Sequence, residues 1–212
     1  MRFLCLHGSG TSAELFDLQA GGITQALEEE GHEFVFIDGK IEAEPTADFK
    51  GSFDGPFYDH YNRGPQPPNG SLAKAFTHTL DIINEQGPFD AVMGFSQGAA
   101  LAAALIVHWK KTHPQSLFSL AVFICGVRPF ESDGMKPIER DSVGAYPIDI
   151  PTVHIFGKKD AVYLDGMGLY GLCDPEKTVL YEHGMGHTIP FGEEETEAMI
   201  RAMQDGMKKC GV

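Results

Sequence analysis

The sequence has few positive charges and no long hydrophobic run. Its 212 residues contain 16 lysines and arginines against 30 aspartates and glutamates, which gives a net charge of −14 at pH 7. Such an acidic chain repels the phosphates of nucleic acids and anionic lipid headgroups, so we expect neither as a partner. The longest apolar runs, at residues 99–107 and 117–125, are far shorter than the roughly 18 residues that a membrane-spanning helix needs. We therefore expect no membrane span.

Cysteines and targeting signals are also scarce. The four cysteines, at positions 5, 125, 173 and 210, have wide and irregular spacings that fit neither a disulfide framework nor a metal site. The first residues lack the charged, apolar and small-residue order of a secretory signal. No glycine-rich loop that could cradle a phosphate is recognisable. We therefore predict a cytoplasmic protein with buried, unreactive thiols, no metal and no cofactor.

Apolar runs typical of buried strands alternate with helical patterns along the chain. The runs lie at residues 3–6, 34–37, 89–93, 117–125, 153–156 and 178–181, and helical spacing of apolar residues occurs at 12–30, 71–86, 99–111 and 193–209. Strands that alternate with helices form a mostly parallel sheet covered on both faces. No repeat or linker divides the chain. We predict one α/β domain, residues 1–212, with about six strands.

The pentapeptide Gly94-Phe95-Ser96-Gln97-Gly98 matches the G-x-S-x-G pattern. It follows an apolar strand and precedes an Ala-rich helix, which is the strand–turn–helix context that this pattern needs. The two glycines allow a tight turn that leaves the serine exposed at the carboxyl edge of the sheet. An ordinary turn with a capping serine is the alternative. We predict that Ser96 is a nucleophile.

A serine nucleophile needs a histidine base, which in turn needs a carboxylate to orient it. In this kind of site the acid and then the histidine follow the serine along the chain. We predict His187 as the base, because it lies in a Gly-rich loop after the last strand; His183 ends that strand, and His154 is in mid-strand. We predict Asp160 as the acid, because it follows the preceding strand, whereas Asp165 and Asp149 are less well placed.

Acyl transfer also needs N–H groups that stabilise the oxyanion. One is expected from the backbone of Gln97, directly after the nucleophile. The other is expected from the loop after the first strand, His7-Gly8-Ser9-Gly10, where small residues let the backbone approach a substrate. We favour the N–H of Ser9, with Gly10 as the neighbouring alternative, and expect His7 to shape the turn through hydrogen bonds.

Residues 39–70 are much longer than a usual connection between a strand and a helix. They contain five of the 13 prolines and five aromatic residues. Long loops in compact domains are often lids or binding loops. We predict an ordered lid that walls an apolar acyl pocket over Ser96, with Phe57, Tyr58 and Tyr61 as substrate contacts and the loop around Tyr146 beside them. The same aromatic residues could instead anchor a structural loop.

Five motifs follow one another along essentially the whole chain: residues 3–10, 14–16, 93–98, 125–129 and 186–190. Together they resemble the fungal serine hydrolase (FSH) family of α/β-hydrolases, although Cys125 and Val127 stand where the family more often has Ser and Phe. The resemblance implies an α/β-hydrolase fold and a triad of Ser96, Asp160 and His187 that hydrolyses esters or thioesters. Several members resemble enzymes that release a polyketide acyl chain from the carrier domain of a fungal synthase.

The sequence leaves the reaction and the partner open. A general carboxylesterase of the acyl-protein-thioesterase type also has Gly-Phe-Ser-Gln-Gly and accepts simple esters broadly. A triad can be redirected to lactonisation or condensation, and the chain could be a catalytically silent binding scaffold. An acyl carrier domain is an expected partner, but both surfaces are acidic, so docking needs a local basic patch such as Lys158, Lys159 or Arg128.

Overall fold

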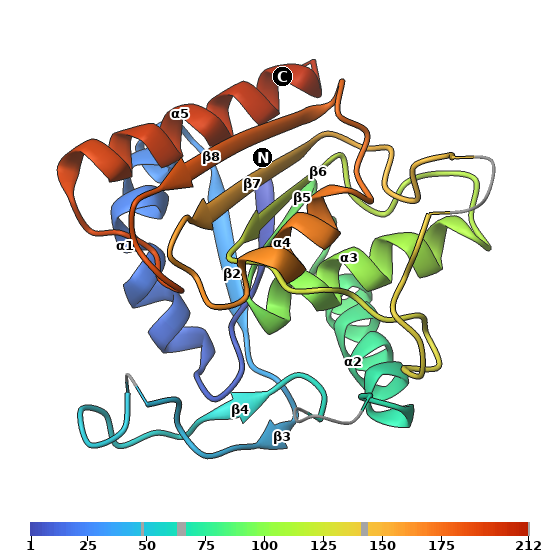
Figure 1. Cartoon of the computed structure of the whole chain (residues 1–212), viewed down its shortest axis with the longest axis horizontal. Coiled ribbons are helices and arrows are strands. Elements are labelled where there is room, and N and C mark those ends of the chain that lie inside the picture. Colours follow the sequence, from blue (N-terminus) through green and yellow to red (C-terminus); the bar gives the residue numbers. More distant parts are fainter. Residues whose placement is uncertain (48, 63–66, 141–143, 212) are drawn as a thin grey trace.

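The computed structural model describes residues 1–47, 49–62, 67–140 and 144–211. Short strands and helices alternate along this part of the chain (Figure 1). In chain order the elements are β1 (Arg2–Leu6), α1 (Ala13–Glu29), β2 (Glu33–Ile37), β3 (Ile41–Glu42), β4 (Tyr58–Asp59), α2 (Gly70–Gln86), β5 (Ala91–Phe95), α3 (Gln97–Lys110), β6 (Leu120–Ile124), β7 (Thr152–Gly157), α4 (Tyr163–Tyr170), β8 (Thr178–His183) and α5 (Glu193–Lys209).

Six of the strands form one parallel sheet in the order β2-β1-β5-β6-β7-β8. Each strand pairs with its neighbour in the same direction, so all six carboxyl ends meet at one edge (Figure 1). In open parallel sheets, ligands bind outside this edge. The prediction of a six-stranded parallel sheet flanked by helices is confirmed, and the topology is that of an α/β-hydrolase.

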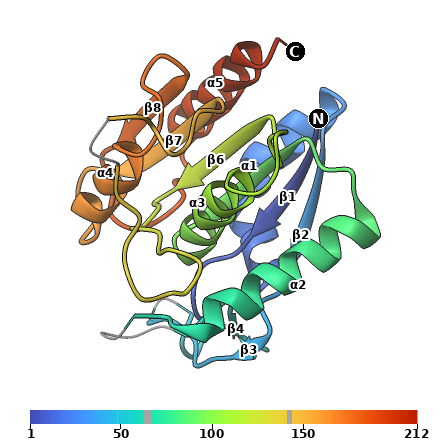
Figure 2. The same cartoon turned by 90° about the vertical axis from the view of Figure 1, so that its right-hand side faces the viewer.

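Helices cover both faces of the sheet (Figures 1 and 2). Along β1, Phe3 and Cys5 belong to the core under α1 and α5, whereas Leu4 and Leu6 belong to the core under α2 and α3. This alternation follows from the two-residue period of a strand, which turns successive side chains to opposite faces. Within the described residues, no helix is both long and apolar enough to cross a membrane.

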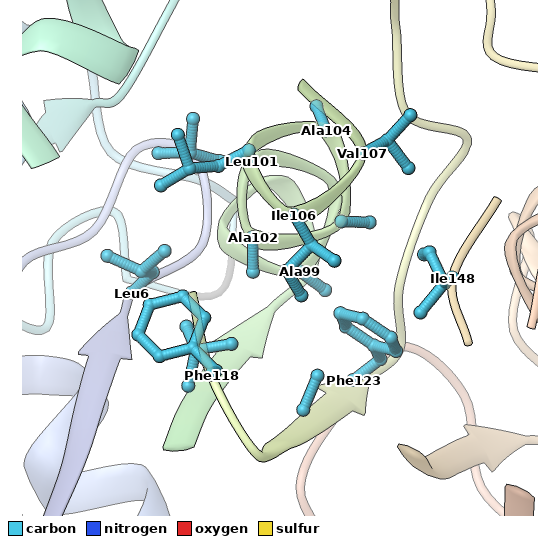
Figure 3. Close-up of a cluster of buried hydrophobic side chains, with 14 of the residues drawn as sticks. Leu6, Ala99, Leu101, Ala102, Ala104, Ile106, Val107, Phe118, Phe123 and Ile148 are labelled. Carbon is cyan, nitrogen blue, oxygen red and sulfur yellow. The ribbon is translucent and has the colours of Figure 1, made fainter. Parts of the chain in front are cut away.

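Helix α3 is buried along almost its whole length (Figure 3). Residues from Gln97 to Val107 are all buried, as expected for an Ala-rich helix held between the sheet and its neighbours. Small side chains allow the helix to approach β1 closely. A Cβ atom on Gly98 would lie 2.0 Å from the carbonyl oxygen of Leu6, so any side chain there would push α3 away from the sheet.

The turn at Ser96 is tighter than the sequence predicts, and the two adjacent glycines of α1 have a packing role. Strand β5 continues through Gly94 and Phe95 instead of ending at Met93, so the turn is confined to Ser96. Helix α1 passes through Gly21 and Gly22 without a break. A Cβ on Gly22 would lie 3.2 Å from the Thr196 side chain, so the glycine allows α1 to pack closely against α5.

The short strands β3 and β4 pair antiparallel within residues 39–70, and the sequence did not predict them. Their ribbon lies below the carboxyl edge of the main sheet, near the start of α1 (Figure 1). Tyr58 forms a bridge with Thr11, which follows the glycine-rich loop after β1. This part of the predicted lid is therefore joined to that loop, whereas residues 48 and 63–66 lie outside the described part of the chain.

Tyr146 does not lie where the sequence suggested. Its ring stacks under the guanidinium of Arg140 at 4.1 Å, and it lines a hollow with Val107 and Lys110 near the end of α3. Ser96 precedes the other end of that helix, and its 14 residues at about 1.5 Å each separate the two ends by about 20 Å. The expectation that the Tyr146 loop walls a pocket over Ser96 was wrong.

Candidate active site

Ser96 occupies the sharp turn between β5 and α3. Its backbone has φ 53° and ψ −112°, a conformation that non-glycine residues rarely adopt and that is found mainly at functional sites. The turn closes because neither flanking glycine has a side chain: a Cβ on Gly94 would lie 2.5 Å from the Ala99 nitrogen. The Ser96 N–H is held by the carbonyl of Ile124 at 2.9 Å. Ser96 thus sits at the carboxyl edge with a partly exposed side chain.

Asp160 and His187 meet at the same edge. Asp160 follows β7 and His187 follows β8, and the two strands are neighbours in the sheet. Asp160 Oδ2 lies 2.7 Å from His187 Nδ1, while the other carboxylate oxygen accepts the N–H of Val162 at 2.9 Å. The His187 ring packs against Phe95, the residue before Ser96, with 5.1 Å between the centroids. Asp160 is buried, and the His187 side chain is 35% exposed.

The competing histidines and acids are placed differently. His154 is fully buried in β7 among aromatic rings, and burial lowers its pKa to about 3. His183 is buried, and its Nδ1 accepts the N–H of Met185 at 3.3 Å. Asp165 lies 3.9 Å from Arg128, and Asp149 pairs with a lysine at the far end of α3. Of these groups, none contacts His187 in the described structure.

The loop after β1 is held by Asp59, a residue that the sequence analysis did not single out. Asp59 is buried, and its Oδ1 accepts hydrogen bonds from Ser9 Oγ at 2.6 Å and from the Gly10 N–H at 2.8 Å. The Gly10 N–H also lies 3.0 Å from the Tyr58 carbonyl. No partner for the Ser9 N–H occurs among the described residues. Ser9 rather than Gly10 therefore has a backbone donor available.

The side chain of Gln97 joins the turn at Ser96 to the segment after β4. Its Oε1 accepts the N–H of His60 at 2.7 Å, and its Nε2 donates to the Tyr61 carbonyl at 2.9 Å. The first N–H groups of a helix have no partner within the helix, so the backbone N–H of Gln97 faces the same edge as Ser96. The sequence indicated this backbone donor, but not the role of the side chain.

His7 shapes the loop after β1, as predicted. Its Nε2 accepts the N–H of Gly39 at 2.9 Å, so the ring proton is on Nδ1, which donates to the Gly8 carbonyl at 2.6 Å. His60 stacks on His7 with 4.3 Å between centroids and donates from Nε2 to the His7 carbonyl. Burial lowers the pKa of both histidines, which favours this neutral pair.

The three predicted pocket residues are in different environments. Phe57 and Tyr58 are partly exposed, and their carbonyls accept hydrogen bonds from Ala43 and Gly10. Tyr61 is buried in the hydrophobic cluster that contains Leu6, and burial raises its pKa. Tyr61 therefore packs in the core beside the site, whereas the side chains of Phe57 and Tyr58 have exposed surface that a ligand can contact.

Cys125 lies beside the Asp160–His187 pair. It follows β6, has φ 46°, and its N–H is held by the Ile155 carbonyl at 2.8 Å. Its thiol is buried and 3.6 Å from the Thr188 carbonyl. Burial, and then the nearby Asp160 charge, raise the pKa of this thiol to about 12. The thiol is therefore protonated at neutral pH.

Comparison with known sequences identifies related proteins over the whole chain. The family described as "Serine hydrolase (FSH1)" matches residues 1–199. The chain is 33% identical to Esterase FPY3 of Fusarium mangiferae, over 99% of this chain and 98% of that protein. It is 31% identical to Hydrolase phiM of Talaromyces stipitatus, over 90% of this chain and 81% of that protein.

Solved structures share the fold at low sequence identity. A carboxylesterase from Mesorhizobium loti superposes with a TM-score of 0.64 at 18% identity, covering 96% of this chain and 88% of that one. SOBER1 of Arabidopsis thaliana gives a TM-score of 0.63 at 17% identity, covering 98% of this chain and 99% of that one. At such low identity the likeness describes the fold alone.

Proposed function

Because the chain belongs to the FSH1 serine hydrolase family, we propose that Ser96, His187 and Asp160 are the catalytic triad of this esterase. The observation that carries the proposal is the 2.7 Å contact between Asp160 and His187, at the edge where Ser96 sits in a strained turn. The natural substrate that we propose is an acyl thioester, from which the enzyme releases a polyketide acyl chain held by a carrier domain.

The geometry supports a two-step acyl transfer. Asp160 accepts a hydrogen bond from the protonated Nδ1 of His187, which leaves the Nε2 lone pair free to take the proton of Ser96 as its oxygen attacks the acyl carbonyl. The imidazolium then gives that proton to the leaving thiol or alcohol. A water molecule, activated by the same histidine, hydrolyses the acyl-enzyme and restores Ser96.

The oxyanion of each step is assigned to the backbone N–H groups of Ser9 and Gln97. The N–H of Gln97 opens α3, where the helix dipole also favours negative charge. The N–H of Ser9 has no partner in the described part of the chain. Asp59 then acts as a positioning residue, because it holds the loop that carries the second donor.

Replacing Asp59 by alanine is expected to lower kcat at least tenfold with little change in KM. Removing one oxyanion donor outright costs about a hundredfold or more, and a displaced donor costs part of that. Asp59→Asn keeps an oxygen that can accept both hydrogen bonds and should recover most of the activity. The exposed Asp54→Ala variant is the control. A loss of kcat in Asp59→Asn as large as that in Asp59→Ala would contradict a positioning role for this oxygen.

Phe57 and Tyr58 are proposed to contact the acyl chain, with Tyr61 supporting them from the core. The ribbon formed by β3 and β4 joins the loop after β1, so the residues around it border the assigned oxyanion donors. This arrangement supports a role for the described part of residues 39–70 as a wall of the acyl site.

A basic patch supports docking of an acidic carrier domain. Lys158 and Lys159 are exposed directly before Asp160, and neither ammonium has an ion-pair partner among the described residues. Arg128 is less available, because it lies 3.9 Å from Asp165. In a chain of net charge −14, two unpaired lysines at the edge of the site provide local attraction for an acidic partner.

Comparison of a carrier-bound thioester with a free one distinguishes docking of the carrier domain from hydrolysis of the thioester. The variant Lys158→Glu/Lys159→Glu is expected to lower kcat/KM at least tenfold for an acyl thioester on a carrier domain. The rate with the corresponding N-acetylcysteamine thioester should stay unchanged. Lys208→Glu/Lys209→Glu, at the end of α5, changes the charge equally and should affect neither substrate. If simple esters are hydrolysed as fast as the carrier-bound thioester, and the lysine-to-glutamate changes alter neither rate, the enzyme is instead a general carboxylesterase.

A further inference from the structure

Three potential metal ligands meet beside the catalytic edge, although they are far apart in the sequence. The sulfur of Cys125, a carboxylate oxygen of Asp160 and a ring nitrogen of His187 all lie within 4.8 Å of one another. They follow β6, β7 and β8, three adjacent parallel strands whose carboxyl ends are side by side. The cluster therefore cannot be recognised from the spacing of these residues along the chain.

We propose that Cys125, Asp160 and His187 form an inhibitory binding site for a soft divalent cation such as Zn²⁺ or Cd²⁺. Thiolate, imidazole and carboxylate are all common zinc ligands, and the thiolate favours soft ions over Mg²⁺ or Ca²⁺. Three protein ligands leave the fourth position of a tetrahedral ion to water. The inference rests on the proposed triad, because two of the three ligands belong to it.

The three ligand atoms lie within 4.8 Å of one another, so small movements are needed to hold an ion. With bonds of about 2.3 Å to sulfur and about 2.0 Å to nitrogen and oxygen, ligand atoms around one zinc ion are about 3.3–3.6 Å apart. The 2.7 Å contact between Asp160 and His187 must open slightly, and the sulfur of Cys125 must move closer to both groups. The partly exposed His187 ring provides the route of entry, because Cys125 and Asp160 are buried.

Binding would stop catalysis by changing the proton on the imidazole. The ion takes Nδ1 of His187 and displaces its proton, which moves to Nε2, so the ring stays neutral. Cys125 loses its thiol proton to solvent, and Asp160 binds through a carboxylate oxygen. Nε2 then carries a proton and cannot accept one from Ser96. One proton is released for each ion bound, as expected for a thiolate site.

The first test is inhibition of ester hydrolysis by Zn²⁺. The wild-type enzyme should be inhibited at micromolar concentration, recover on addition of a chelator, and be insensitive to Mg²⁺. In Cys125→Ser the inhibition constant should rise at least tenfold, with each variant compared with its own metal-free rate. Cys210→Ser, which changes a cysteine outside the cluster, should be inhibited like the wild type. Absence of inhibition in the wild type, or equal inhibition in Cys125→Ser, would overturn the proposal.

The second test does not depend on activity. Cd²⁺ bound to a thiolate absorbs in the ultraviolet through sulfur-to-metal charge transfer, and titration of the wild type should give one saturating band. The band should be absent in Cys125→Ser and retained in Cys210→Ser. Circular dichroism verifies that each variant is folded. If Cys125→Ser is not folded, Cys125→Ala is used in its place. A band that remains after Cys125 is replaced would reject the metal site. This result does not depend on whether the proposed substrate is correct.

Discussion

The variant Ser96→Ala is expected to lose about five to six orders of magnitude in kcat for any acyl substrate that the enzyme accepts. Alanine leaves the turn, the glycines and the helix in place, so the protein should fold normally. Only the oxygen that we propose as the nucleophile is removed. The residual rate comes from the oxyanion donors and from substrate binding, which still act on an attacking water molecule. The loss is measured as initial rates with a p-nitrophenyl ester and an N-acetylcysteamine thioester.

Covalent labelling gives an independent readout of the same prediction. A fluorophosphonate probe should modify the wild-type protein at Ser96 and leave Ser96→Ala unmodified. Ser52→Ala, which removes an exposed hydroxyl in residues 39–70, is the control and should be labelled and active. Substantial turnover by Ser96→Ala, or labelling of another serine, would show that the nucleophile had been assigned to the wrong residue.

The variant Asp160→Asn is expected to lower kcat by about four orders of magnitude. The amide is nearly the same size, so the geometry of the loop should persist. The NH₂ group of asparagine, however, can donate to Nδ1 of His187, which favours the tautomer with its proton on Nε2. That tautomer cannot accept the proton of Ser96, and the asparagine does not stabilise an imidazolium.

The matched control is Asp165→Asn, because Asp165 was the competing acid in the sequence and lies beside Arg128 instead of His187. Its activity should stay near the wild-type value. The double variant Ser96→Ala/Asp160→Asn should be no slower than Ser96→Ala alone, since the triad acts as a unit. Additive losses would mean that Asp160 contributes to something other than orientation of the histidine.

Local patterns explain why much of the fold was predictable. Six apolar runs predicted the six strands. The reason is clearest for β5, β6 and β7, which are buried on both faces and leave continuous apolar segments in the sequence. The strand–turn–helix around Ser96 was visible because Gly94 and Gly98 have no room for a side chain. The family prediction, made from ordered motifs, is confirmed by the match over residues 1–199.

The residues that support the site were not predictable in this way. Asp59 lies 50 residues from Ser9 in a Pro-rich segment without strand or helix periodicity, and its role depends on a ribbon of two-residue strands. The Gln97 side chain reaches residues 60 and 61, 36 to 37 positions away. No spacing rule connects such distant positions.

Short-range patterns in the sequence were enough to predict the sheet, the turn at Ser96 and the order of the proposed serine, acid and histidine along the chain. Which groups meet is visible only in the folded chain. There Asp160 contacts His187, Asp59 holds the loop after β1, Tyr146 lies near the far end of α3, and the thiol of Cys125 lies beside the Asp160–His187 pair. The physical reason is that the carboxyl ends of parallel strands converge at one edge, whatever their separation along the chain.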